Sequence, residues 1–144
     1  MNLAIGCDHA GLNLKNHLLN WLIRQGHEVR DYGTDTTDSI DYPDIAFQVA
    51  QTVAQGTHEK GILVCGAGIG VAIAANKVTG IRAFNCYDAL SATLSREHND
   101  TNIITFGERL ITPLIAETCL KIWLETPFAG GRHLTRVMKL NPNV

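Results

Sequence analysis

Short apolar runs recur along the chain and are separated by polar or glycine-containing segments. Apolar runs of about 4–8 residues are typical of strands, and runs without alternation are typical of strands buried on both faces. The second run alternates only weakly between apolar and polar residues. The pattern predicts strands at residues 2–6, 28–32, 62–65, 81–86 and 103–106.

Between these runs, apolar residues recur with the spacing of one helical face. Leu14, Leu18, Trp21 and Leu22 stand at positions i, i+4, i+7 and i+8, which predicts a helix after the first strand. A last short helix is expected at about residues 132–140. The apolar positions of the other predicted helices include Ile45, Val49 and Val53; Leu90 and Leu94; and Ile115, Cys119, Ile122 and Trp123.

The predicted strands therefore alternate with helices along the chain. This order favours a parallel sheet with helices on both faces, because each helix returns the chain to the same end of the sheet. The sequence contains no internal repeat, low-complexity segment or domain linker. We expect a single α/β domain over residues 1–144, built as a three-layer α/β/α sandwich with a Rossmann-like, five-stranded parallel sheet.

Composition and charge narrow the class of protein. Hydrophobic residues make up 45% of the chain and charged residues 18%, and the net charge is −2. Such a charge gives no basic footprint for nucleic acid, and no apolar run approaches the ~20 residues of a membrane span. The four cysteines show no C-x-x-C pair and no metal-binding spacing. We expect a soluble, cytoplasmic protein with reduced thiols that needs no cofactor and binds neither nucleic acid nor membrane.

The residues with the most chemical potential lie in the stretch 61–77, which reads GILVCGAGIGVAIAANK. A predicted strand ends at Cys65, a glycine-rich turn follows, and a helix begins after it. Backbone N–H groups at such a junction bind anions, and the same environment favours the thiolate of a cysteine. Cys65 is therefore a candidate thiolate beside a row of oxyanion donors. The donors are expected from Gly66, Ala67, Gly68, Ile69 and Gly70.

Other interpretations of this stretch stay open. A cysteine at a strand end is often only a small buried hydrophobe. A dinucleotide fingerprint is disfavoured, because Val71 stands where its third glycine is required and the motif belongs on the first strand of a βαβ unit, although Asp88 roughly meets its acidic condition. A phosphate-binding P-loop is excluded, because no Gly-Lys-Ser/Thr follows the glycines.

Polar residues also follow the first and fifth predicted strands. Asp8 and His9 come directly after the first strand, and Arg109 comes shortly after the fifth. Ligands of open α/β sheets bind at the carboxyl ends of the strands, where these residues and Cys65 are expected to meet. Asp8 can instead be a helix N-cap, since aspartate is favoured at that position.

A second set of polar residues belongs to helices. His98 and Asn99 stand near a predicted helix end, where a histidine can simply complement the helix dipole. Arg132 and Arg136 are four residues apart and share a helical face, which suits a phosphate dianion but is also common on solvated surfaces. Together with Cys65, these residues provide the groups needed to bind a phosphorylated small molecule and to move a proton on it.

Six short motifs occur in order along the chain. They are GCDHAG at 6–11, DYP at 41–43, CGAGIG at 65–70, AANK at 74–77, SREHND at 95–100 and GGRH at 130–133. In these motifs the sequence resembles the ribose-5-phosphate isomerase B family, which includes galactose-6-phosphate and allose-6-phosphate isomerases. The resemblance runs from near residue 3 to near residue 137. One departure is Ala67, where the family usually has Thr or Ser.

The resemblance implies a metal-free aldose–ketose isomerase. It implies that Cys65 is the base that moves a proton between C2 and C1 through an enediolate, and that His98 is the acid that helps to open the furanose ring. It also implies the strand order 2-1-3-5-4, and a homodimer or homotetramer whose active site is shared across the dimer interface. The residues implied in sugar and phosphate binding are Asp8, His9, Tyr42, Gly66, Ala67, Gly68, Ile69, Gly70, Asn99, Arg109, Arg132 and Arg136.

Three functions stay open at this point. The first is interconversion of ribose 5-phosphate and ribulose 5-phosphate. The second is isomerisation of a hexose 6-phosphate, allose or galactose, by the same chemistry. The third is a phosphate- or nucleotide-binding module without catalysis, although such a module would need neither Cys65 nor His98.

Overall fold

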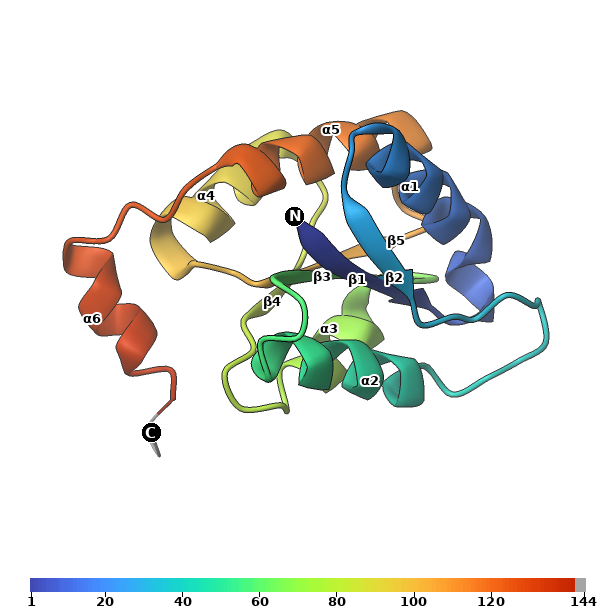
Figure 1. The fold of residues 1–144 in the computed structure, drawn as a ribbon, viewed down its shortest axis with the longest axis horizontal. Coiled ribbons are helices and arrows are strands. Elements are labelled where there is room, and N and C mark those ends of the chain that lie inside the picture. The colour runs from blue at the N-terminus through green and yellow to red at the C-terminus, as the bar shows by residue number, and fades with distance from the viewer. Residues whose placement is uncertain (142–144) are drawn as a thin grey trace.

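The computed structural model describes residues 1–141 and contains a five-stranded parallel sheet between two layers of helices (Figure 1). The strand order is β2-β1-β3-β5-β4, and every neighbouring pair is parallel. The predicted fold class and strand order are thus confirmed, while residues 142–144 of the predicted domain lie outside the described residues. The strands are β1 (Asn2–Cys7), β2 (Glu28–Asp31), β3 (Lys60–Cys65), β4 (Ala83–Asn85) and β5 (Ile103–Gly107).

The helices cover both faces of the sheet. In Figure 1, α1, α4 and α5 lie on one face, α2 and α3 lie on the other, and α6 stands apart from both layers. Within residues 1–141, no helix combines the length and the apolar character that crossing a membrane requires. The helices are α1 (Leu12–Arg24), α2 (Tyr42–Ala54), α3 (Ile69–Ala75), α4 (Ala89–Asn99), α5 (Pro113–Glu125) and α6 (Arg132–Met138), with a short 3₁₀ helix η1 (His9–Gly11) before α1.

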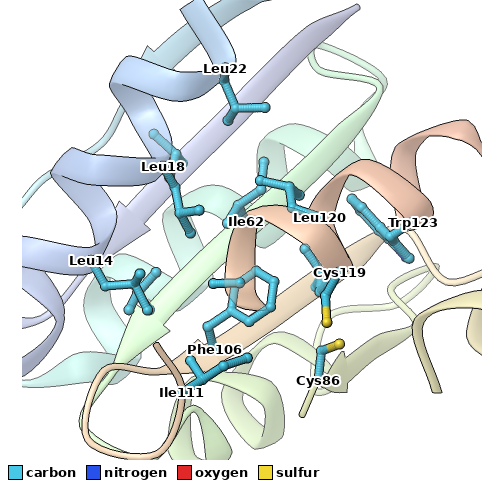
Figure 2. Close-up of a cluster of buried hydrophobic side chains, with 14 of the residues drawn as sticks. Leu14, Leu18, Leu22, Ile62, Cys86, Phe106, Ile111, Cys119, Leu120 and Trp123 are labelled. Carbon is cyan, nitrogen blue, oxygen red and sulfur yellow. The ribbon is translucent and has the colours of Figure 1, made fainter. Parts of the chain in front are cut away.

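Each face of the sheet is packed by its own hydrophobic core, because successive residues of a strand point to opposite faces. In β3, Ile62 belongs to the core with α1 and α5, whereas Leu63 belongs to the core with α2 and α3. Figure 2 shows the first core, where side chains of α1 and α5 meet those of β3 and β5. Its largest member, Trp123, is fully buried and donates a hydrogen bond from Nε1 to Thr101 Oγ1 at 2.8 Å.

In helices α4 and α5, some residues that the apolar spacing placed on the buried face are exposed. Leu90 is 67% exposed, Leu94 is 37% exposed and Ile115 is 46% exposed. On α4 the buried positions are instead taken by small residues such as Ala92 and Ser95, so α4 approaches α5 closely and turns its leucines outward. The leucine positions on α4 were therefore a poor guide to its buried face.

The fourth strand is shorter than predicted, because it covers only Ala83–Asn85 of the residues 81–86. Ile81 is instead part of a turn, in which its N–H donates to the carbonyl of Val78. The N–H of Arg82 is bound by the side chain of Asn102 rather than by a strand neighbour. The edge strand β4 is consequently short and pairs with only part of β5.

The parallel strands bring their carboxyl ends to one edge of the sheet. Cys65 at the end of β3 pairs with Gly107 at the end of β5, and Cys7 at the end of β1 pairs with Val64. The loops after β1, β3 and β5 therefore begin side by side. We call this edge, which carries Cys65, the Cys65 edge of the sheet.

Helix α4 runs back across the sheet and ends at the opposite edge. It ends at Asn99, and the carbonyl of Asn102 just beyond it accepts a hydrogen bond from the N–H of Gly61, near the start of β3. Cys65 is four positions after Gly61, so at about 3.3 Å per residue the two edges are about 13 Å apart along β3. We call this second edge, which carries the end of α4, the His98 edge.

Candidate functional site

Cys65 is the last residue of β3, and its thiol lies beneath the turn that follows. The residue is 6% exposed and belongs to the core between the sheet and helices α2 and α3. The backbone N–H of Gly68 donates a hydrogen bond to Sγ at 3.1 Å. Donors of this kind stabilise an anionic acceptor more strongly than a neutral one. Cys65 is therefore a hydrogen-bonded thiol in addition to a buried side chain.

Gly68 shapes the turn between β3 and α3. Its φ of 77° lies in the left-handed region that glycine adopts without strain, and a Cβ here would lie 2.4 Å from Asn85 Oδ1. At Gly70, a Cβ would lie 2.7 Å from Cζ of Tyr42. The Tyr42 ring at the start of α2 therefore packs directly against the turn and forms one wall of the Cys65 edge.

Arg109 lies beside the same turn. Its guanidinium Nη1 lies 3.0 Å from the place that a Cβ would occupy on Gly66. The backbone N–H of Arg109 donates to the Gly66 carbonyl at 3.1 Å, and the N–H of Glu108 donates to the Cys65 carbonyl at 2.9 Å. These bonds extend the pairing of β3 and β5 into their loops and hold an exposed cation next to the glycines.

Asp8 and His9 complete the group at the Cys65 edge. Asp8 is 7% exposed and caps η1 by accepting from the N–H of Ala10 at 2.9 Å, so the N-cap interpretation is confirmed. Its own N–H donates to the carbonyl of Val64, which ties this loop to β3. His9 Nδ1 accepts from the N–H of Ile40 at 3.2 Å, so the long loop after β2 fixes the imidazole.

The remaining predicted site residues lie at the His98 edge. His98 and Asn99 form the last turn of α4, and α6 carries Arg132 and Arg136, both exposed. The two helices are linked, because the N–H of Ala129 donates to the carbonyl of Glu97. Within one chain, the structure therefore does not bring His98 or the two arginines to Cys65.

His133 is a neighbour of His98 that the residue-by-residue prediction did not include. The two imidazole rings stack with centroids 4.3 Å apart and an interplanar angle of 12°. Loss of hydration beside the stacked ring, and then the positive charges of His98, Arg132 and Arg136, lower the pKa of His133 below the usual 6.5. Its place in the GGRH motif, directly after Arg132, was the available signal. The stack joins α4 to α6, and the positive charge at the His98 edge comes from Arg132 and Arg136.

The described side chains do not converge as a metal site would require. Among residues 1–141, no three or more His, Cys, Asp or Glu side chains group together in a way that could hold a metal ion.

Comparison with known proteins agrees with this arrangement of motifs. A profile of the family described as Ribose/Galactose Isomerase matches residues 3–140. The chain belongs to the ribose/galactose isomerase family. Ribose-5-phosphate isomerase B of Escherichia coli (strain K12) is 47% identical over 135 residues, which cover 94% of this chain and 91% of that protein. The family assignment made from the six motifs is confirmed.

Other members of the ribose/galactose isomerase family are similarly close. D-Erythrulose-4-phosphate isomerase of Pectobacterium atrosepticum is 41% identical and covers 97% of this chain and 93% of its own length. The solved structure of Clostridium thermocellum ribose-5-phosphate isomerase B has a TM-score of 0.97 at 46% identity, covering 99% of this chain and 96% of that one. Near-equal identities to isomerases of a pentose and a tetrose phosphate show that the family fold alone does not fix the substrate.

Proposed function

We propose that this protein interconverts ribose 5-phosphate and ribulose 5-phosphate. One observation carries the proposal: the Cys65 thiol accepts a hydrogen bond from the glycine turn at a sheet edge that also presents Asp8 and His9. Enzymes that transfer a proton at the carbon beside a carbonyl group need a positioned acid–base group and backbone N–H donors near the carbonyl oxygen. The E. coli and C. thermocellum relatives, both named ribose-5-phosphate isomerase B, support the pentose phosphate as substrate.

The proposed reaction moves one proton between neighbouring carbons. The Cys65 thiolate removes the proton from C2 of the open-chain aldose, the C–H electrons form the C1–C2 double bond, and negative charge develops on O1. A proton passes from the C2 hydroxyl to O1, and the thiol then returns its own proton to C1 as the C2 carbonyl forms. In this proposal free backbone N–H groups of the turn at residues 66–70, other than that of Gly68, which donates to Cys65 Sγ, stabilise the developing oxyanion, and each such donor is worth about 10²–10³-fold in comparable enzymes.

We propose that a second copy of the chain completes this site. His98, as the ring-opening acid, and Asn99, as a sugar contact, lie at the edge away from Cys65 in the same chain, about 13 Å along β3. A symmetric pair that sets the His98 edge of one protomer on the Cys65 edge of its partner makes two complete sites. Helix α6 outside the layers, with Leu134 and Met138 at 50% and 68% exposure, supports such contact.

In this proposal the arginines bind different parts of the substrate. Arg132 and Arg136 bind the phosphate from the partner's α6, where exposed guanidinium groups match its charge. Arg109, at the other end beside Gly66, contacts the sugar together with Tyr42. The reaction uses no metal in this proposal, and the cytoplasm is its expected location.

The direct test is to incubate the protein with ribose 5-phosphate and to measure ribulose 5-phosphate. Wild type should turn over and continue to do so after exhaustive chelation, whereas Cys65→Ala should bind the sugar phosphate without converting it. Binding without turnover by wild type would identify a phosphate-binding module instead. Activity lost on chelation and regained with a divalent ion would overturn the metal-free mechanism.

The same assay compares substrates of different chain length. The D-erythrulose-4-phosphate isomerase from P. atrosepticum favours a test of tetrose phosphates, and the family description favours a galactose phosphate. Allose 6-phosphate is added because the motif resemblance extends to allose-6-phosphate isomerases. We expect the highest kcat/KM for ribose 5-phosphate. A higher value for a hexose 6-phosphate would assign the protein to the second hypothesis.

A further inference from the structure

Two polar side chains from β4 and β5 lie under the glycine turn and bind its carbonyl groups. Asn85 Nδ2 donates to the carbonyl of Ala67 at 3.0 Å, and Thr105 Oγ1 donates to the carbonyl of Gly68 at 2.7 Å. Asn85 and Thr105 are directly opposite each other in the β4–β5 pair. Two consecutive peptide groups of the turn are therefore held from below by neighbouring positions of the sheet.

Holding these carbonyls also orients the amides that belong to the same peptide groups. A trans peptide is planar, so its N–H points away from its C=O. The peptide whose carbonyl is held by Asn85 is the one whose Gly68 N–H donates to Cys65 Sγ at 3.1 Å. The peptide held by Thr105 carries the N–H of Ile69, which must point away from the sheet, toward the open Cys65 edge. Each side chain thus fixes one donor direction.

Asn85 accepts an unfavourable environment in this position. Its Oδ1 is buried and has no hydrogen-bond partner within residues 1–141, while its Nδ2 also contacts the Tyr87 hydroxyl at 2.6 Å. The amide cannot turn round, because Oδ1 would then face the Ala67 carbonyl, which has no hydrogen to donate. Buried polar atoms without partners are rare in proteins and call for a compensating role. Holding the Ala67–Gly68 peptide is such a role.

Thr105 is the better-buried member of the pair. It is 0% exposed in the middle of the sheet, between Ile104 and Phe106, where an apolar side chain would normally pack. Its hydroxyl is satisfied by the Gly68 carbonyl at 2.7 Å. A valine has nearly the same shape and would fill the same space, so the hydroxyl serves the turn rather than the core.

We infer that Asn85 and Thr105 are positioning residues that set the amide directions around Cys65 and the developing oxyanion; the inference rests on the proposed isomerase function. Neither side chain touches the reacting atoms. They act through the Ala67–Gly68 and Gly68–Ile69 peptides, whose misalignment removes donors from the transition state more than from the bound substrate.

The test compares Thr105→Val and Asn85→Ala with the control Thr118→Val. Thr118 makes the same kind of bond, from Oγ1 to the Leu114 carbonyl at 3.0 Å, but on the exposed face of α5. For Thr105→Val we expect kcat to fall about 10–100-fold with KM changed less than about threefold, and Thr105→Ser to restore most of the loss. Thr118→Val should resemble wild type.

A second readout does not depend on turnover. Cys65 is the least buried of the four cysteines, so its alkylation by iodoacetamide can be followed by mass spectrometry of its peptide. Loss of the Gly68 N–H donor should slow this alkylation at least about threefold in Asn85→Ala, because the thiolate loses its donor, whereas Thr105→Val frees the Ile69 N–H instead and should change the rate less. If wild type turned over no sugar phosphate, the proposed function would fail and this rate would still decide the inference.

Two results would overturn the inference. One is a kcat in Thr105→Val and Asn85→Ala, together with an alkylation rate in Asn85→Ala, that match those of Thr118→Val. The other is a loss of kcat that parallels a fall in the folded fraction, measured by circular dichroism, and that Thr105→Ser does not restore. Asn85→Ala keeps the test decisive if Thr105→Val does not fold, because Asn85 is partly exposed at the end of the edge strand.

Discussion

At the scale of single residues, the buried Lys15 side chain holds a loop of the candidate site in place through an ion pair. It is 1% exposed on α1, and its Nζ contacts Asp31 Oδ2 at 2.6 Å. The other carboxylate oxygen of Asp31 accepts from the N–H of Gly33 at 2.8 Å, and the carbonyl of Gly33 is bound by the N–H of Cys7. The ion pair therefore anchors the loop after β2, whose Ile40 N–H donates to His9 Nδ1.

Lys15→Met should destabilise the fold. Methionine keeps the apolar stem in place but removes the cation, which leaves the 32% exposed Asp31 carboxylate with one partner fewer. We expect a loss of about 1–3 kcal/mol in the free energy of unfolding, measured by urea denaturation. The exposed Lys121→Met serves as control and should change the value by less than about 0.5 kcal/mol. Equal stabilities of the two variants would contradict the anchoring role.

We predict that the free energy of unfolding depends on pH through Lys60, which lies at the start of β3. Burial, and after it the nearby Arg96 guanidinium, lowers the pKa of Lys60 from 10.5 to about 8, while its Nζ stays 4.9 Å from the centre of the Trp123 ring. The unfolded chain holds this proton more tightly than the native state does. Keeping Lys60 charged therefore costs stability below pH 8, and the cost is relieved as the pH rises from about 8 to about 10.5.

Lys60→Met removes this titration. The free energy of unfolding of wild type should thus rise relative to that of the variant between about pH 8 and about pH 10, as urea denaturation at each pH would show. Burial also raises the pKa of Cys7 to about 11 and of Cys86 to about 12, which destabilises the fold as the pH rises above 9, but both proteins share these thiols. A difference that stays constant with pH would contradict the assignment.

At the scale of elements, α6 has the fewest contacts with the sheet and its two helical layers, so its surface residues can be changed with little effect on the core. It lies outside the layers, packs mainly against α4, and presents Arg132 and Arg136. Arg132→Ala or Arg136→Ala should raise KM for the sugar phosphate about 10–100-fold, because each removes a charge-assisted hydrogen bond to phosphate. Lys139→Ala, just after the same helix, is the matched control and should leave KM near the wild-type value.

Unphosphorylated ribose separates this role from a structural one. It should bind weakly to wild type and no more weakly to either arginine variant. An unchanged KM together with loss of assembly in gel filtration would make these arginines interface residues instead.

The elements themselves were largely predictable from the sequence, and the exceptions have physical causes. The apolar run at residues 62–65 and the stripe from Leu14 to Leu22 identified β3 and α1, because burial on a sheet imposes those periods. Leu90 was wrongly expected on the buried face of α4, because the close approach of α4 to α5 leaves room there for small residues rather than for leucine. The Asn85 contact could not be predicted, since it joins residues that periodicity does not relate.

The candidate site was predictable only in part for a related reason. The residues after β1, β3 and β5 had to meet, because parallel strands share an edge, and Asp8 and Cys65 do so. His98 lies in the last turn of a helix that returns to the far edge, and the length of that helix rather than the residue type decides where it ends. The motif resemblance, rather than periodicity, supplied the expectation of a site shared by two chains.

At the scale of the whole molecule, the two sheet edges predict that inactive variants complement each other. In a dimer of Cys65→Ala with His98→Asn, one site lacks both groups and the other has Cys65 from one chain and His98 from its partner. After unfolding and joint refolding at equal amounts, activity should therefore recover to about a quarter of wild type. Each variant refolded alone is the control. No recovery in a mixture that forms dimers would mean that both groups act within one chain.

The two-core architecture also has a consequence for optical measurements on this protein. Both tryptophans lie on one side of the sheet: Trp123 of α5 is fully buried, and Trp21 of α1 packs against the same core. The helices α2 and α3 on the other side contain none. Indole emission will thus report the opening of the α1–α5 layer, while loosening of the layer next to Cys65 passes without a fluorescence signal. Agreement between fluorescence and far-ultraviolet circular dichroism is accordingly the measurement that tells whether the two layers unfold together.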